Sequence, residues 1–167
     1  NLIEKKNYNG IFIEGNEVVF NKLQKNYQNH KKVTCIEAVV GFDKKNNLDH
    51  ILKTTTIPVD FDFLSIDIDG NDFHVWQAMQ TYKPKVICVE FNPTIPTEVL
   101  FVQPPNPQIT QGSSLLSLVQ LGKEKGYELV CVLPFNALFI KNNYYPLYEI
   151  DDNRPETLRT NLDFVTY

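Results

Sequence analysis

Acidic side chains end three short apolar segments of the sequence, and these residues are the best suited to chemistry. Glu14 follows IFI, Asp67 and Asp69 end FLSIDID, and Glu90 ends VICVE, with Asn92 two positions later. Each apolar run is predicted to be a β-strand, and parallel strands end at a common edge of their sheet. We therefore expect these polar groups to converge.

Converging carboxylates support two kinds of chemistry. A carboxylate beside a substrate hydroxyl acts as a general base, and oxygen ligands from neighbouring strands are those that Mg²⁺ prefers. The run DIDGND is not a calcium loop, because Gly70 comes too early and no glutamate occupies the twelfth position. We expect Asp69 and Glu90 to act on a hydroxyl, directly or as ligands of a metal such as Mg²⁺, with Asn92 orienting it.

Several of these side chains also have a structural alternative. Asp69 and Asp72 stand at the start of a predicted helix, where a cap typically contributes about 1 kcal/mol. For Glu14 the structural alternative is to hold a loop, although an acid after the second strand of a nucleotide-binding fold commonly binds ribose hydroxyls. Asp67 falls inside an apolar run, where an unpaired carboxylate is costly to bury, so it needs a partner. His74 is more simply a packing residue than a proton acceptor.

Strands and helices alternate along the chain, as the spacing of apolar residues predicts. The strands are expected at residues 11–13, 33–40, 61–68 and 85–91, and the helices at 18–27, 48–52, 73–79 and 114–126. The closing runs YELVCVL and ALFIKN are close enough in sequence to form an antiparallel hairpin.

This order predicts a single α/β domain over residues 1–167, with a mostly parallel sheet covered on both faces. The C-terminal hairpin is expected to give that sheet one antiparallel edge. Residues 94–111 are rich in proline and show no period. A loop of that length in a compact domain is more often functional than filler.

The overall composition excludes several classes of protein. Hydrophobic residues make up 43% of the chain and charged residues 22%, with a net charge of −4. This balance is globular and lacks the positive charge of a general nucleic-acid binder. No apolar run reaches the ~18 residues of a membrane span, so we expect no membrane association. Cys35, Cys88 and Cys131 show neither zinc nor disulfide spacing, which favours a reducing, cytoplasmic setting.

Five segments of the chain together resemble the FkbM-type S-adenosylmethionine-dependent methyltransferases. They are GIFIEGN, FDFLSIDIDGNDFHVW, PKVICVEFNP, QGSSLLSLVQLGKEKGYELV and FNALFIKN. In that family a strand that ends in a D-x-[DE]-G turn is followed by a helix and then by a strand that ends in an acid. Here those segments read IDIDG and VICVEFN. The resemblance spans residues 10–142.

The resemblance implies a Rossmann-like three-layer methyltransferase fold and transfer of a methyl group from S-adenosylmethionine to a hydroxyl. The acceptor would be a small molecule or a glycan, often a sugar. The resemblance also implies that Glu14 binds the cofactor ribose and that Asp67 faces the methionine end. Ala38 and Val39 would lie beside the adenine. Residues 94–111 would then cover the acceptor.

Within that loop, Phe101, Pro104 and Pro105 are the side chains expected to stack on a sugar or on an apolar group. The family's first strand and its glycine-rich cofactor turn have no counterpart in the sequence. In the family topology that strand lies between those of Ile11 and Ser65. We therefore expect the chain to be truncated at its N-terminus relative to the family. The two flanking strands would expose edges that invite self-association.

Two other interpretations stay open from the sequence. A Rossmann-type nucleotide-sugar or dinucleotide enzyme would share the expected fold, although no serine–tyrosine–lysine arrangement is apparent. A degenerate Rossmann-like module would keep the fold for binding alone. A glycine-rich strand end upstream of Asn1 would favour the transferase over that module.

Overall fold

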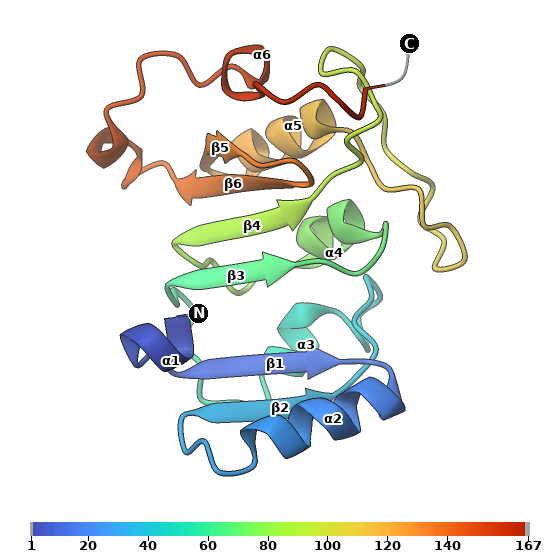
Figure 1. Cartoon of the computed structure of the whole chain (residues 1–167), viewed down its shortest axis with the longest axis vertical. Coiled ribbons are helices and arrows are strands. Elements are labelled where there is room, and N and C mark those ends of the chain that lie inside the picture. The colour runs from blue at the N-terminus through green and yellow to red at the C-terminus, as the bar shows by residue number, and fades with distance from the viewer. Residues whose placement is uncertain (1, 166–167) are drawn as a thin grey trace.

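The structure, a computed structural model, describes residues 2–165 and has helices and strands in the predicted alternation (Figure 1). The strands are β1 (Gly10–Glu14), β2 (Val33–Glu37), β3 (Phe63–Ile66), β4 (Val86–Glu90), β5 (Tyr127–Val132) and β6 (Asn136–Lys141). The helices are α1 (Leu2–Lys6), α2 (Glu17–Tyr27), α3 (Leu48–Leu52), α4 (Asp72–Ala78), α5 (Leu115–Lys125), the 3₁₀ helix η1 (Tyr145–Tyr148) and α6 (Pro155–Leu158).

The two longest helices begin and end at residues that suit helix termini. The Asn16 side chain accepts hydrogen bonds from the first amides of α2, including that of Val19 at 3.1 Å. Ser114 caps α5, because its hydroxyl accepts from the Ser117 amide at 3.3 Å. Gly126 ends α5 with a φ of 81°, a left-handed conformation that glycine adopts at little cost.

The strands form two sheets, one parallel and one mixed, instead of the single sheet that the sequence predicts. β1 and β2 form a parallel pair, and the second sheet has the order β3-β4-β6-β5. β3 and β4 are parallel, whereas β6 runs antiparallel to both β4 and β5. The hairpin is therefore confirmed, but its second strand lies inside the sheet. Ala137, Phe139 and Ile140 make β6 a buried strand, which suits pairing on both sides.

Two of the observed strands are shorter than predicted. β2 ends at Glu37 although the apolar run continues to Val40, and β3 covers Phe63–Ile66 within the predicted range 61–68. A run of apolar residues indicates that a segment is buried, whereas a strand extends only as far as its backbone is hydrogen-bonded to a neighbouring strand. The pairing of β1 with β2 ends at Glu14 and Glu37, so the residues beyond leave the sheet.

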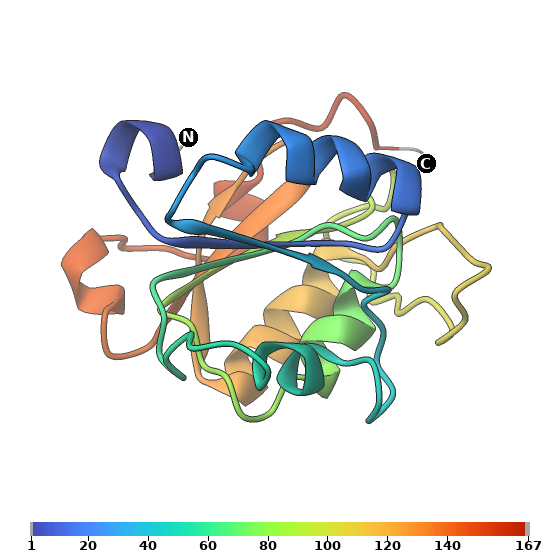
Figure 2. The same cartoon turned by 90° about the horizontal axis from the view of Figure 1, so that it is seen from below.

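Helices cover the two faces of the sheets unequally. Helix α2 lies over one face of β1 and β2, and α3, α4 and α5 lie on the opposite side (Figure 2). The core lies between β3, β4 and β6 and the helices α4 and α5. Trp76, Ile87, Val89, Leu118 and Phe139 are fully buried there.

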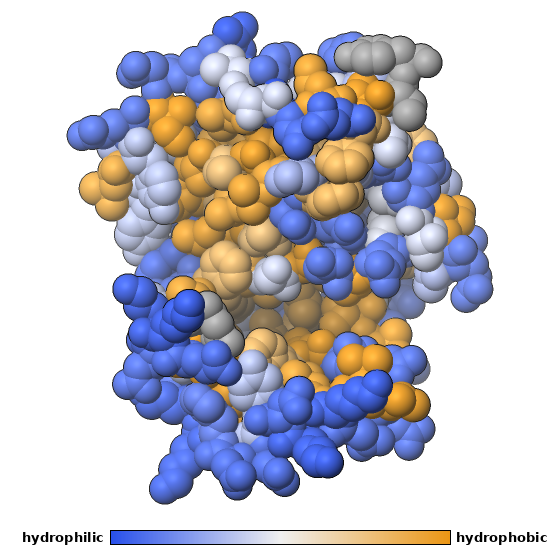
Figure 3. Space-filling view, in the orientation of Figure 1, coloured by the Kyte–Doolittle hydropathy of each residue, from blue (hydrophilic) through white to orange (hydrophobic). Residues whose placement is uncertain are grey.

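The other face of the four-stranded sheet is only partly covered. Burial alternates along β3 and β4, so that Ile66 and Ile87 are buried while Phe63, Ser65 and Cys88 stay exposed or half-buried. Figure 3 shows this side of the molecule with a broad apolar surface over the centre. The alternation is the period of two that a β-strand imposes on its side chains.

A gap separates β1 from β3. Among the strands of residues 2–165, β1 pairs only with β2, and β3 pairs only with β4. β1 and β3 run side by side in the same direction (Figure 1), and the surface between them is hollowed and apolar (Figure 3). This gap lies where the resemblance places the family's first strand, between the strands of Ile11 and Ser65.

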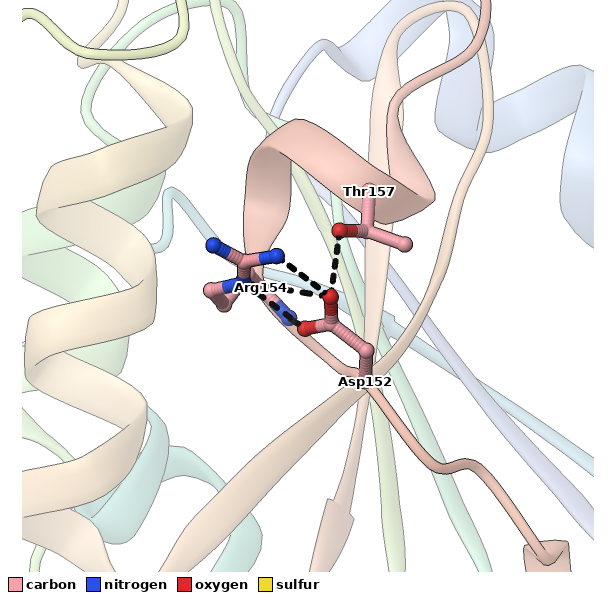
Figure 4. Close-up of polar contacts among 3 residues, drawn as sticks. All are labelled: Asp152, Arg154 and Thr157. Carbon is pink, nitrogen blue, oxygen red and sulfur yellow. Dashed lines mark hydrogen bonds and ion pairs between the residues drawn. The ribbon is translucent and has the colours of Figure 1, made fainter.

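Two arginines order the C-terminal segment: Arg154 bonds within the segment, and Arg159 fixes it to the rest of the fold. Asp152 accepts hydrogen bonds from the Arg154 guanidinium and from the Thr157 hydroxyl just before and within α6 (Figure 4). These bonds, with the Arg154 guanidinium first, lower the pKa of Asp152. Arg159 is buried and donates to the carbonyls of Ile95 and Pro93. The segment therefore holds one end of the proline-rich loop.

No helix within residues 2–165 is both long and apolar enough to cross a membrane.

Candidate functional site

The turn after β3 is held by Asp72, and this corrects the expected helix cap. Asp72 is buried, and its carboxylate accepts from the amides of Ile68 and Gly70, each at 2.9 Å. The bonds reach back into the turn, and the N-cap residue of α4, Asn71, makes no side-chain capping bond. Burial raises the pKa of Asp72, and the two amide bonds partly offset that effect. Asp72 thus shapes the turn and does not cap the helix.

The same turn has an unusual backbone. Asp69 has a φ of 56° and Gly70 a φ of 119°. A Cβ at Gly70 would lie 2.8 Å from Cα of Thr110, so the turn packs directly against the proline-rich loop. No hydrogen bond joins the Asp69 side chain to an amide of α4 within the described chain. A capping role for Asp69 is therefore not observed, and its carboxylate lies with those of Asp67 and Glu90.

The expected convergence of acids occurs only in part: it takes place at the ends of β3 and β4, and Glu14 is not in this cluster. Asp67, Asp69 and Glu90 each offer a carboxylate oxygen, and these oxygens lie within 4.8 Å of one another. Asp67 has a partner, since it is hydrogen-bonded to Glu90, but burial does not require one. It is exposed, however, because β3 ends one residue earlier at Ile66. Its place in an apolar run therefore does not bury it.

Glu90 has the chemical properties of a proton acceptor near neutral pH. Its side chain is half-buried, and burial is the main cause that raises its pKa to about 7. Repulsion from the carboxylates of Asp67, Asp72 and Asp69 adds to the shift, as does the hydrogen bond with Asp67. Two carboxyl groups at such a distance share protons readily, because they resist being charged together.

The Asn92 side chain bonds to both ends of the proline-rich loop, a structural role that the sequence did not predict. Its Nδ2 donates to the carbonyl of Gln111 at 2.8 Å, and its Oδ1 accepts from both the amide and the hydroxyl of Thr94. Both ends of its amide group are therefore engaged in the two ends of the loop. This arrangement makes Asn92 an anchor of the backbone, and its expected role in orienting a hydroxyl stays a prediction.

The proline-rich loop is ordered by a buried polar network that the sequence does not reveal. Gln103 is fully buried; its Nε2 donates to the Ile109 carbonyl at 2.8 Å and its Oε1 accepts from the Gly112 amide at 2.7 Å. Nε2 of His74 lies 2.6 Å from the Gln103 carbonyl oxygen. Asn71 donates to the carbonyls of Asn106 and Ile109. His74 is therefore structural, as the simpler interpretation expects.

The side chains expected to stack on a ligand differ in exposure. Phe101 is half-buried and its amide donates to the Ser114 hydroxyl at 3.0 Å, whereas Pro104 and Pro105 are exposed. The loop reaches the acidic cluster through the contact between Thr110 and Gly70. It is thus a fixed wall beside the acids in this conformation.

The residues expected to bind a cofactor form a second group at the ends of β1 and β2. The Glu14 carbonyl accepts from the Ala38 amide at 3.1 Å, and Gly15 packs against Val39. One carboxylate oxygen of Glu14 accepts from the Asn16 amide at 2.7 Å, which is the loop-holding bond of the structural alternative. Ala38 and Val39 also line an open, mainly apolar hollow of about 370 Å³ with Ile51.

The two groups lie on opposite sides of the gap, at the same edge of the fold, where β1 and β3 both end (Figure 1). The sequence identified the four acids and the two apolar residues of these groups; it assigned Asp72 to helix capping and did not identify Gln103. A carboxylate that bonds backward and a glutamine among prolines have no sequence pattern that distinguishes them. The chain matches no protein-family model, no curated protein and no solved structure with significance.

Proposed function

We propose that the chain is an S-adenosylmethionine-dependent methyltransferase with a Rossmann-like fold that acts on a hydroxyl of a sugar or glycan. The observation that carries the proposal is the acidic cluster, in which Glu90 has a pKa of about 7 beside Asp67 and Asp69. A base with a pKa near the working pH is the most effective for taking a proton from a hydroxyl.

The strand order also supports the proposal. One strand placed in the gap would give the continuous order β2-β1-new-β3-β4-β6-β5, with the new strand at the centre. Ligands of open α/β sheets bind outside the carboxyl ends of the strands at such a central point. Both residue groups of the candidate site lie at that edge.

The residues present fit the groups that this reaction needs. Glu14 would bind ribose hydroxyls, with the apolar wall of Ala38 and Val39 beside it. S-adenosylmethionine supplies an electrophilic methyl group when it is bound. Carboxylate oxygens are the donors that Mg²⁺ prefers, so Asp69 and Glu90 would hold it with Asp67 if the reaction uses a metal.

The work of this chain's own residues is positioning and proton transfer. The acceptor hydroxyl would lie against the Glu90 carboxylate, which takes the proton as the oxygen becomes bonded to carbon. Asp67 and Asp69 keep the pKa of Glu90 high and so keep it basic enough to act. The free thiols of Cys35, Cys88 and Cys131 suit a reducing compartment, and we propose a cytoplasmic location.

Cofactor binding tests the proposal directly. S-adenosylmethionine would be titrated into the chain by calorimetry. We expect Glu14→Ala to weaken binding about 10-fold or more, because a charged hydrogen bond to ribose is lost. Glu17→Ala, at an exposed acid three residues away, is the matched control. Equal affinity of the two variants would reject Glu14 as the ribose ligand, and no binding by the unaltered chain would favour the non-catalytic module.

A further inference from the structure

An open polar pocket lies between the end of α2 and the start of β2, at the opposite edge of the fold from the acidic cluster (Figure 1). Its volume of about 500 Å³ is in the range of small-molecule sites. The polar side chains that line it are those of Gln24, Tyr27, Gln28, Asn29, His30 and Lys31. We propose that this pocket binds a small phosphorylated sugar, at a site separate from that of the proposed methyl transfer.

Three carboxamides give the pocket the capacity to bind hydroxyl groups. Gln24, Gln28 and Asn29 are exposed, so their amide groups are accessible from solvent. A carboxamide both donates and accepts hydrogen bonds, and a sugar hydroxyl does the same. Several hydroxyls on one small molecule can therefore each find a partner in this lining.

His30 supplies a second observation that points to a ligand. Its ring lies edge-on to that of Tyr27, with 6.1 Å between the ring centroids. Its Nδ1 is buried and has no hydrogen-bond partner within residues 2–165. A buried polar atom is costly to leave unpaired. The ring is half-buried, and rotation about its Cβ–Cγ bond would turn Nδ1 toward a ligand hydroxyl in the pocket.

The surface around the pocket is positive although the chain as a whole is not. The net charge of the chain is −4, whereas residues 18–36 contain four lysines and no acidic residue. Glu17 and Glu37 stand at the far ends of α2 and β2, about 15 Å from Tyr27 and about 13 Å from Val33 by helix and strand geometry. Both separations exceed the Debye length of ~8 Å at physiological salt. An anionic group is therefore favoured here.

Some of these lysines also have a structural explanation. Lys25 lies in the last turn of α2, where a cation complements the helix dipole. Lys32 donates to the Asn7 carbonyl at 3.0 Å. Lys31 differs from both, because it follows the helix and lines the pocket. The preceding helix α1 carries two lysines and one glutamate, so it does not reverse the sign of the surface.

The combination of groups decides the class of ligand. Lys31 suits a phosphate, and the carboxamides suit hydroxyls, so a phosphorylated sugar engages both. A bare phosphate would leave the carboxamides unused. A nucleic acid would need basic side chains spaced along a groove, whereas Lys31 is the one lysine among the described residues that line this pocket.

Saturation-transfer NMR tests the proposal, because it observes the ligand and is not obscured by association of the chain. The probe is glucose 6-phosphate, and glucose and inorganic phosphate are the comparison ligands. We expect glucose 6-phosphate to receive saturation from the chain and to bind about 10-fold or more tightly than either comparison ligand, because only this probe engages both kinds of group.

Two lysine variants separate a built site from general attraction. Lys31→Gln removes the charge and keeps a long side chain, and it should weaken binding of glucose 6-phosphate about 10-fold. Lys22→Gln is the matched control, because Lys22 is exposed on the same α2 helix but does not line the pocket. It should change the affinity less than about 2-fold, since exposed charges at a distance are screened.

His30→Phe gives a measurement that does not depend on charge. Phenylalanine keeps a ring beside Tyr27 and has no Nδ1, so the melting temperature should be preserved or raised. Binding of glucose 6-phosphate should nevertheless weaken about 10-fold, because the hydrogen bond to the ligand is lost. A histidine with only a structural role would alter the melting temperature and leave the affinity unchanged.

Several results would overturn the proposal. One is no saturation transfer to glucose 6-phosphate at about 10 mM, which is above the dissociation constant of even a weak specific site. Equal weakening by Lys31→Gln and Lys22→Gln would show diffuse attraction to a basic surface. Equally tight binding of inorganic phosphate would show a general anion site, and tighter binding of a single-stranded oligonucleotide would show a polyanion surface. None of these readouts depends on S-adenosylmethionine or on turnover.

Discussion

At the scale of single residues, Glu90 is the side chain whose environment departs most usefully from that of a free amino acid. Its carboxyl group is half-buried beside Asp67 and Asp69, and both effects act against the charged form. A shift in this direction is what a general base needs when it works near pH 7. The pKa of about 7 therefore leads to a pH-dependent prediction.

We expect turnover to rise with pH through about 7, because Glu90 accepts a proton only in its deprotonated form. Glu90→Gln should lower turnover by about 10²-fold and remove this rise, since the amide cannot accept the proton. The measurement is the release of S-adenosylhomocysteine with a hydroxyl acceptor between pH 5 and 9. A variant with the wild-type pH profile would show that another group is the base.

The free energy of unfolding should fall with pH where turnover rises. Measuring both quantities therefore separates the effect of Glu90→Gln on catalysis from its effect on stability. A carboxyl group whose pKa rises from 4.5 to about 7 on folding stabilises the fold below pH 4.5, and this contribution is lost as pH rises through about 7. Glu90→Gln has no such group. Its urea unfolding free energy should therefore fall less than that of the wild-type chain between pH 5 and 8.

At Asp69 a substitution can remove the charge of the side chain without disturbing the backbone. Asparagine adopts the φ of 56° about as readily as aspartate, so Asp69→Asn should leave the unfolding free energy nearly unchanged. If the carboxylate acts on the acceptor, turnover should fall by about 10²-fold while cofactor affinity barely moves. Full activity would exclude the role. Partial recovery with added Mg²⁺ would favour a metal held by Asp69 and Glu90.

At the scale of elements, the site depends on a turn and a loop that fix each other. Asp72 bonds the turn from within, Gln103 bonds the loop from within, and Gly70 meets Thr110 where the two touch. Neither element is a regular helix or strand. Their order therefore comes from these buried polar contacts, which are costly to leave unmade.

Gly70→Ala should destabilise the fold by at least about 2 kcal/mol, from strain at a φ of 119° and from a clash with the Thr110 backbone. Gly126→Ala is the matched control, because Gly126 has a φ of 81° but open space around its Cα. It should cost only about 1 kcal/mol. Chemical denaturation of both variants is the measurement. Equal losses would show that the turn and the loop are not packed together.

At the scale of the whole molecule, the sheet is divided. The β1–β2 pair and the four-stranded sheet join through side-chain packing, with two unpaired strand edges between them. Open edges pair readily with other chains. The proline-rich loop and the C-terminal segment hold the larger part together through Arg159.

We expect the 167-residue chain to self-associate or to unfold at a low temperature, because the gap between β1 and β3 leaves backbone groups of both strands unsatisfied. Sedimentation velocity over a range of concentrations and scanning calorimetry measure the two outcomes. A monomer with a sharp, cooperative transition would show that the two sheets are stable without an added strand.

The sequence by itself determined the elements and the convergence of acids. Apolar periodicity predicted the six strands and the helices α2 to α5 within a few residues, but not α1, η1 or α6. Strand ends located Asp67, Asp69 and Glu90, because parallel strands end at one edge. The tertiary structure alone decided that Asp72 bonds backward, that Asn92 and Gln103 anchor a loop, and that β6 lies between β4 and β5. Each of these depends on which partner lies nearby in space, and a local pattern of residues carries no information about a neighbour that is distant in sequence.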